Sequence, residues 1–213
     1  MKVDVNSTAV LVCSGLKHEI FPATLSIPKA LYPLGDTPLV LVGLSRFYSL
    51  GIKKVVLVVS RSDRTAIECL IGNGEVLGMS VTYFYQDTRK GLSCLINSLL
   101  KTHSRIVVRM VDFLDTNLSR EIVSKGNNVV FKSNSRHHYL DAEYVFNTDV
   151  NLNEDFDISI ENSEIIEIKK SKLINPLYLY NTQDMILALT HKNKEILEQV
   201  KANFGQTFLY KIV

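Results

Sequence analysis

The chain has 213 residues, of which 46% are hydrophobic and 22% are charged, and its formal net charge is +2. This length suits one domain with a sizeable core, and the balanced charge argues against a nucleic-acid partner. No apolar run reaches transmembrane length, and the first ten residues lack the apolar core of a signal peptide. We therefore expect one soluble, cytoplasmic domain over residues 1–213, with no membrane partner.

The cysteine content also indicates a cytoplasmic protein. Cys13, Cys69 and Cys94 are an odd number and lack metal-ligand spacing. This usage is typical of a reduced compartment. We expect all three to be small apolar side chains of the core.

The first predicted element is a strand over residues 9–13, AVLVC. Such an unbroken apolar run is typical of a strand buried on both faces. Ser14 and Gly15 end the strand and allow a sharp turn, which gathers backbone N–H groups that favour phosphate. After a polar loop, Pro28 restricts the backbone in front of Lys29, whose point charge suits phosphate.

Strand and helix patterns alternate through the first half of the chain. Helices are predicted at residues 38–50, 62–70 and 91–101, and strands at residues 54–60, 79–85 and 105–111. Gly51 is a plausible stop for the first of these helices. This alternation predicts an α/β fold, with a Rossmann-like, mostly parallel sheet and helices on both faces. Ligands bind such sheets beyond the carboxyl ends of the strands, where we place Gly15, Gln86 and Asp112.

The second half is predicted to be a small β-rich part. Strands are expected at residues 129–132, 143–147, 156–161, 165–169 and 177–180, and helices at residues 182–189 and 193–202. The turn-forming residues 162–164 join two of these strands into a hairpin.

The opening segment carries a family resemblance. It reads AVLVCSGLKHEIFPATLSIPKAL, and it resembles in the same register the signature AVILAAGxGTRLxPLTxxxPKAL of the sugar-phosphate nucleotidyltransferases. Gly15 and Lys29 fall on that pattern. Lys17, His18 and Glu19 depart from it, because the family has glycine, threonine and a triphosphate-supporting arginine at these positions.

The resemblance continues to about residue 118. Tyr85, Gln86 and Gly91 resemble the YxxQ…G(T/S)A segment of the family, and Asp112 resembles the aspartate of its GD dipeptide. The closing W-x-D-x-G-T segment, which carries a second metal-binding aspartate, is missing, since the chain has no tryptophan.

The resemblance implies a transferase of sugar nucleotide biosynthesis. Such an enzyme transfers a nucleotide from a nucleoside triphosphate to a sugar phosphate or similar phosphorylated acceptor, releases pyrophosphate and uses Mg²⁺. It implies a nucleotide-binding core over residues 1–118 and an acceptor-side part over residues 119–213. The implied site comprises Lys29 and Lys17 as catalytic residues, Leu11, Ser14, Gly15, Gln86 and Gly91 as nucleotide-binding residues, and Asp112 as metal ligand.

Simpler roles stay open for these residues. Asp112 can also be a cap after its strand, and Lys29 can be a solvated lysine after a proline. Gln86 and Gly91 can belong to an ordinary loop. If the chain is an enzyme, Lys17 would replace the charge lost at Glu19, because both belong to one loop.

Two alternatives to an enzyme also stay open. A non-catalytic nucleotidyltransferase-like binding or regulatory subunit is favoured by the altered loop and the missing aspartate, and nucleotidyltransferase-like subunits of the translation-initiation nucleotide exchange factor set a precedent. A third interpretation is a domain that completes its site beside a second copy or a partner subunit. We favour the enzyme slightly, because Lys29, Gln86, Gly91 and Asp112 remain in place.

Overall fold

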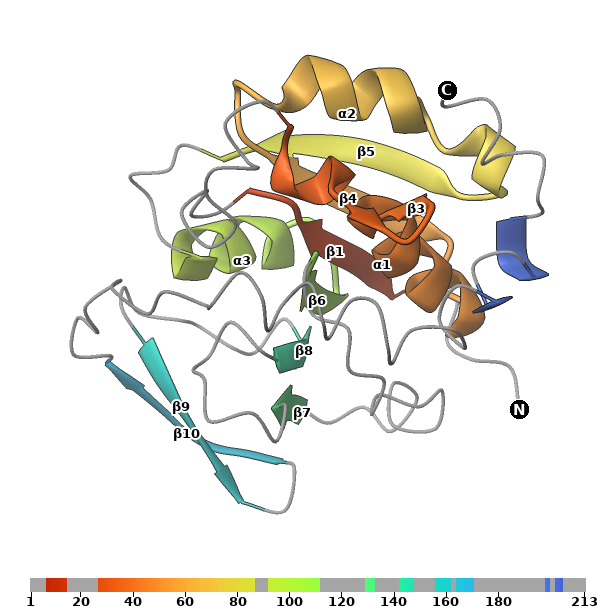
Figure 1. Cartoon of the computed structure of the whole chain (residues 1–213). Coiled ribbons are helices and arrows are strands. Elements are labelled where there is room, and N and C mark those ends of the chain that lie inside the picture. Colours follow the sequence, from red (N-terminus) through yellow and green to blue (C-terminus); the bar gives the residue numbers. More distant parts are fainter. Residues whose placement is uncertain are drawn as a thin grey trace.

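The computed structural model describes residues 7–14, 27–86, 92–111, 129–132, 142–147, 156–161, 164–170, 198–199 and 202–204 (Figure 1). Of residues 92–94 and of the strands beyond residue 128, only the backbone is described. Within these ranges, no helix is long and apolar enough to cross a membrane.

The described strands form one sheet in the order β5-β4-β1-β6-β8-β7-β10-β9 (Figure 1). The first four in this order are β5 (Ser80–Tyr85), β4 (Lys54–Val59), β1 (Thr8–Val12) and β6 (Arg105–Met110). Every neighbouring pair among these four is parallel. The predicted parallel core of the first half is therefore confirmed, with strand boundaries within about one residue of the expected ones.

The later strands extend the same sheet in antiparallel fashion. They are β7 (Val129–Lys132), β8 (Ala142–Asn147), β9 (Phe156–Glu161) and β10 (Glu164–Lys170). The β9–β10 hairpin was predicted and is confirmed. Because β8 pairs directly with β6, the predicted β-rich part is not a separate layer, and the sheet as a whole is mixed.

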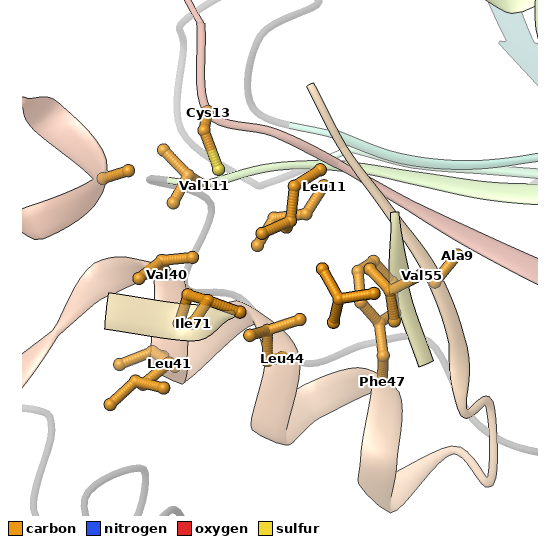
Figure 2. Close-up of a cluster of buried hydrophobic side chains, with 14 of the residues drawn as sticks. Ala9, Leu11, Cys13, Val40, Leu41, Leu44, Phe47, Val55, Ile71 and Val111 are labelled. Carbon is orange, nitrogen blue, oxygen red and sulfur yellow. The ribbon is translucent and has the colours of Figure 1, made fainter. Parts of the chain in front are cut away.

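Helices α1 (Leu39–Ser49) and α2 (Arg64–Ile71) cover one face of the parallel strands. Successive side chains of a strand point to opposite faces, so alternate residues of β1 and β4 reach this layer. Figure 2 shows the resulting cluster, which includes Ala9, Leu11, Cys13, Val40, Leu41, Leu44, Phe47, Val55, Ile71 and Val111. This apolar layer holds β1 against α1.

Helix α3 (Leu92–Leu100) lies against β6. Along each parallel strand, the residues that alternate with those of the α1–α2 cluster are also buried, but they lie outside that cluster. They include Val10, Val12, Val56, Val58, Ile106 and Val108. The buried α3 side chains Leu95, Ile96 and Leu99 are likewise outside that cluster. Strand alternation therefore assigns α3 to the opposite face, as predicted.

The polypeptide that connects β1 to α1 contains short elements that the sequence did not predict. They are the 3-10 turn η3 (Lys29–Leu31) and the paired strands β2 (Pro33–Leu34) and β3 (Thr37–Pro38). Gly35 turns this two-residue hairpin with φ of 62°. Elements of two or three residues are too short to give a periodic pattern. A second 3-10 turn, η4 (Glu75–Leu77), follows α2.

Helix α1 ends at Ser49, and the predicted stop Gly51 follows two residues later with φ of 84°. In its middle, Gly43 allows a close approach to β1, because a Cβ added there would lie 2.7 Å from Leu11 Cδ1. The absence of a side chain at Gly43 therefore sets how closely α1 packs on the central strand.

The outer side of α1 binds a C-terminal segment. Residues 198–199 and 202–204 have helical backbone. Asn203 Nδ2 donates to Ser45 Oγ at 2.7 Å and to Ser49 Oγ at 2.9 Å, and the Phe204 ring meets Tyr48 edge-on at 5.8 Å. These residues agree with part of the helix predicted over residues 193–202. The strand and helix predicted at residues 177–180 and 182–189 lie outside the described residues.

The cysteine prediction was right for Cys13 and wrong for Cys69. Cys13 is buried at the end of β1, whereas Cys69 is exposed on α2. Helix α2 buries Ile67 and Ile71, which are four residues apart, so Cys69 midway between them points away from the core. The side chain of Cys94 lies outside the described residues.

Candidate functional site

The carboxyl ends of the parallel strands meet at one edge of the sheet. The Ser14 N–H donates to the Val58 carbonyl at 3.0 Å, and the Gln86 N–H donates to the Val59 carbonyl at 3.1 Å. The Val111 N–H donates to the carbonyl of the last β1 residue at 3.0 Å. The predicted common edge is thus formed by the described residues Ser14, Gln86 and Val111. Gly15 follows Ser14 and Asp112 follows Val111 in the chain, and both lie outside the described residues.

Ser14 and Gln86 are brought into direct contact. The Ser14 Oγ donates a hydrogen bond to Gln86 Oε1 at 2.5 Å, although the two residues are 72 positions apart. Ser14 is only 6% exposed. Two of the predicted nucleotide-binding residues therefore lie side by side at the edge where α/β sheets bind ligands.

Lys29 is held rigidly and is shielded from water. Pro28 precedes it with φ of −52°, and the Leu31 N–H closes a turn on the Pro28 carbonyl at 2.8 Å. Lys29 is 8% exposed, and the next residue, Ala30, belongs to the buried cluster. This burial contradicts the solvated-lysine interpretation. A buried lysine requires a polar or anionic partner, and the phosphate role stays a prediction.

Leu11 has a structural position instead of a ligand-facing one. Its side chain is fully buried and packs under Gly43, while its backbone position pairs with Leu57 on one side and Arg109 on the other. The side chain is therefore not available to a nucleotide, and its contribution is to seat β1 beneath the edge.

Lys17, Glu19 and Gly91 lie outside the described residues, as Gly15 and Asp112 do. Within the described ranges, no group of three or more His, Cys, Asp or Glu side chains could hold a metal ion. Magnesium is commonly bound by one or two carboxylates together with substrate phosphates, so a single carboxylate ligand, as predicted at Asp112, agrees with the donor set that Mg²⁺ uses.

The one buried carboxylate described at this edge, Asp63, is engaged in a turn. It is 7% exposed, its Oδ1 accepts from Ser62 Oγ at 3.1 Å, and its N–H donates to Ser60 Oγ at 3.3 Å. These contacts shape the entry to α2, so we assign Asp63 a structural role.

Sequence reasoning missed a polar cluster beside Gln86. Tyr85 Oη donates to Glu68 Oε1 at 2.6 Å, and Arg64 Nε donates to Glu68 Oε2 at 3.0 Å. The Arg64 guanidinium lies 4.5 Å from the centroid of the Tyr85 ring. The hydrogen bond from Tyr85, followed by that from Arg64, lowers the pKa of Glu68. The spacing of Arg64 and Glu68 by four residues on one helix was the available signal.

A buried charge in β6 was also missed. Arg109 is 1% exposed and stands two residues before Val111, on the same face as Leu11. Its register partner on β8 is Glu143. The signal was an arginine inside the otherwise apolar run IVVRMV of residues 106–111. Since a buried guanidinium requires polar or anionic neighbours, this position marks a polar spot within the sheet.

The arrangement can be compared with known families. A family model described as nucleotidyl transferase matches residues 8–118, which is just over half of the chain. The chain belongs to the nucleotidyl transferase family. The matched range contains the four parallel strands, Lys29, and the Ser14–Gln86 contact, so the family assignment and the candidate site coincide.

Curated relatives of this nucleotidyl transferase chain match over shorter ranges. The glucose-1-phosphate thymidylyltransferase of Mycobacterium tuberculosis is 29% identical over 84 residues, which are 39% of this chain and 29% of that protein. The UTP–glucose-1-phosphate uridylyltransferase of Klebsiella pneumoniae is 36% identical over 63 residues, which are 30% of this chain and 21% of that protein. The aligned part thus covers less than a third of each relative.

Solved structures support the same fold. A candidate glucose-1-phosphate thymidylyltransferase from Bacillus anthracis superimposes with a TM-score of 0.56 at 17% identity. The superposition covers 96% of this chain and 83% of that one. At this identity the likeness establishes the fold alone.

Proposed function

We propose that this nucleotidyl transferase chain transfers a nucleotide from a nucleoside triphosphate to a sugar phosphate and releases pyrophosphate. The observation that carries the proposal is the contact of Ser14 with Gln86 at the carboxyl edge of a family domain. The names of the relatives point to a hexose 1-phosphate as acceptor and to a thymidine or uridine triphosphate as donor.

The reaction asks little covalent chemistry of the protein. An oxygen of the acceptor phosphate attacks the α-phosphorus of the triphosphate, the bond from that phosphorus to the bridging oxygen breaks, and pyrophosphate leaves. Catalysis then rests on positioning the two substrates and on neutralising their negative charge. A buried edge of a rigid parallel sheet suits the first task, and fixed cations suit the second.

We assign the charge-neutralising role first to Lys29. Its backbone is fixed by the turn that starts at Pro28, and its side chain is largely removed from water. Coulomb attraction to a phosphate is several times stronger in such surroundings than in bulk water. Lys17 is proposed as the second cation, and the N–H groups around Gly15 as donors to the phosphates.

The remaining roles concern the base and the metal. Gln86 offers a donor and an acceptor suited to a base edge, and Gly91 would let the base approach the backbone. Asp112 is proposed to hold Mg²⁺, which when bound neutralises phosphate charge. These assignments follow from the positions of the residues after strand ends and from the family pattern.

A non-catalytic binding or regulatory subunit is the second candidate. Glu19 stands where the family pattern has an arginine, and the metal-binding aspartate of the closing segment is missing. Both features weaken phosphate and metal binding without affecting the fold.

Pyrophosphate release by the full chain tests the proposal. The assay combines UTP, dTTP, GTP, CTP and ATP with a panel of sugar 1-phosphates in the presence of MgCl₂. We expect release with one donor–acceptor pair, and loss of release in Lys29→Ala. Lys54→Ala is the matched control, because Lys54 is exposed at the opposite, amino end of β4 and should leave release unchanged.

The outcomes separate the two candidates. Release that is blocked by Lys29→Ala but not by Lys54→Ala supports the enzyme. If no pair gives release while a triphosphate still raises the melting temperature, the chain is a nucleotide-binding scaffold. If no triphosphate binds, both nucleotide proposals fail.

A further inference from the structure

Strand β5 forms one end of the eight-stranded sheet, so one of its two backbone edges has no neighbouring strand among the described residues (Figure 1). The N–H groups of Ser80 and Gln86 donate to carbonyls just before and at the end of β4, at 2.8 Å and 3.1 Å. Successive residues of a strand direct their backbone groups to opposite sides, so the even-numbered residues of β5 face β4. The N–H and C=O groups of Tyr83 and Tyr85 therefore point away from the sheet.

A loop covers only the first part of this outer edge. The Val81 N–H donates to the Asn73 carbonyl at 2.9 Å, and Tyr83 Oη donates to the Gly72 carbonyl at 2.6 Å. Within the described part of the chain, no backbone group pairs with the outward N–H and C=O groups of Tyr83 and Tyr85. The open stretch of the edge thus begins after Val81.

The open stretch lacks the features that normally protect an edge strand from pairing. Residues 80–86 read SVTYFYQ and contain neither a charged residue nor a proline, and their register with β4 has no bulge. Natural proteins usually place one of these features on an exposed edge. Tyr85 is 40% exposed, although it is a large side chain with a mostly apolar ring. An uncharged, aromatic and regular edge of this kind is suited to pairing with another strand.

We propose that two copies of this chain associate through β5, with the two strands antiparallel about a two-fold axis at Phe84. In this register Tyr83 of one copy lies opposite Tyr85 of the other, and the outward N–H and C=O groups of both residues bond across the interface. The sequence is nearly symmetrical about Phe84, with a tyrosine on each side and then the uncharged Thr82 and Gln86. The edge is therefore complementary to itself, as a two-fold interface requires.

The loop beside Val81 selects this register. An axis at Tyr83 would place the second strand opposite Val81, whose outward N–H is already bonded to Asn73. An axis beyond Phe84 would set Tyr83 opposite residues that follow the strand. An axis at Phe84 uses both outward tyrosines, and the second strand reaches its end at Gln86 before it meets the loop.

The chemistry of the edge favours a second copy as the occupant. Pairing in this register joins aromatic to aromatic residues and uncharged to uncharged ones, so no like charges meet. Phe84 is half-buried and lies outside the α1–α2 cluster, so it belongs to the other face of the sheet. Across the axis it faces its own copy as a non-hydrogen-bonded pair, the closer of the two pair types. Because only five residues of each copy pair, we expect a weak dimer that forms at high protein concentration.

The second copy would also border the candidate site. Gln86, whose backbone lies at the carboxyl edge of the sheet, stands opposite Thr82 of the second copy in this register. The association itself requires no nucleotide, so it can be tested independently of the proposed function.

Sedimentation equilibrium of the full chain, over about a hundredfold range of concentration, tests the proposal. We expect the average mass of the wild type to rise from that of a monomer towards that of a dimer. In Phe84→Lys two ammonium groups would lie directly opposite each other, so we expect the dissociation constant to rise about tenfold or more. Val76→Lys is the matched control, because Val76 is 75% exposed on η4, outside β5, and its change should leave the dimer unaffected.

A charge exchange identifies the register. Phe84→Glu alone should be monomeric for the same reason as Phe84→Lys. An equimolar mixture of the two variants should dimerise, because opposite charges then face each other on the axis. Only an interface in which position 84 lies opposite itself gives this rescue.

Hydrogen exchange of the wild type gives a measurement that does not depend on how the variants fold. On going from low to high protein concentration, the amides of Tyr83 and Tyr85 should exchange about tenfold more slowly, since they become bonded across the interface. The amide of Thr82 is the internal control, because it already faces β4.

Four results would overturn the proposal. They are a wild type that stays monomeric over the whole range, a folded Phe84→Lys that dimerises as the wild type does, a mixture of the two charged variants that stays monomeric, and exchange at Tyr83 and Tyr85 that ignores concentration. Each of these results leaves the proposed nucleotide transfer standing.

Discussion

Replacing Gly43 by alanine should destabilise the protein through a clash with Leu11. The added Cβ would lie 2.7 Å from Leu11 Cδ1 and 2.9 Å from Cδ2, well inside the ~3.5 Å at which carbon atoms normally meet. Leu11 is fully buried, so its side chain has little room to turn away. Overpacking of this kind costs about 1–3 kcal/mol, and the helix propensity gained from alanine returns about 1 kcal/mol. We expect a net loss of up to about 2 kcal/mol in the free energy of unfolding.

A double-mutant cycle in urea isolates this clash from other effects. Leu11→Ala alone should cost about 2–5 kcal/mol, because it leaves a cavity in the core. In the double variant, the added methyl group at position 43 enters that cavity. The sum of the stability losses of the two single variants should therefore exceed the loss measured for the double variant, by about 1 kcal/mol or more. Gly51→Ala is the control: its φ of 84° makes alanine strained, yet nothing lies within 4 Å, so it should not couple to Leu11. Strict additivity of Gly43→Ala and Leu11→Ala would refute the argument.

Three further results are expected. Asp112→Asn should weaken Mg²⁺-dependent triphosphate binding in calorimetry and leave the melting temperature within about 2 °C of the wild-type value. If triphosphate binding depends neither on Mg²⁺ nor on this substitution, Asp112 is a structural cap. Glu19→Arg should tighten triphosphate binding about tenfold if the chain is a scaffold, whereas in an enzyme Lys17→Ala should abolish pyrophosphate release. The pKa of Glu68 lies below its ordinary 4.5, so its carboxylate stabilises the fold above that pH and this contribution is lost as pH falls further. Glu68→Gln should therefore show a smaller drop in melting temperature between pH 6 and pH 3; a drop equal to that of the wild type would contradict this.

The regular elements of the first half could be predicted because their apolar patterns are long and unbroken. Strand β4, with five consecutive buried residues after Lys54, and helix α1, with Gly51 as its stop, show this directly. Segment η3 and the β2–β3 pair could not be predicted, since elements of two or three residues give no period. Cys69 was misplaced because a cysteine suits a core by composition, while the phase of its helix decides exposure.

The candidate site could be predicted as a set of strand ends but not as a set of contacts. Parallel alternation placed Ser14 and Gln86 at one edge. Their hydrogen bond depends on strand order and on the register of β1, β4 and β5, which no local pattern encodes. The burial of Lys29 could not be predicted for a similar reason, because it depends on the packing of η3 on α1, which is a tertiary contact. The roles of Lys17, Gly91 and Asp112 remain predictions.

The seating of Asn203 on α1 has a consequence for the order in which the chain folds. Asn203 is 158 positions from Ser45, so this contact belongs to the most non-local in the molecule. During synthesis the strands and helices up to residue 111 leave the ribosome long before Asn203 does. Domain cores generally form as their residues emerge, and contacts of long sequence separation form late. Ser45 and the Tyr48 ring therefore lack the contacts of Asn203 and Phe204 until residues 202–204 have been made. In that interval the outer side of α1 is the surface that a chaperone would meet.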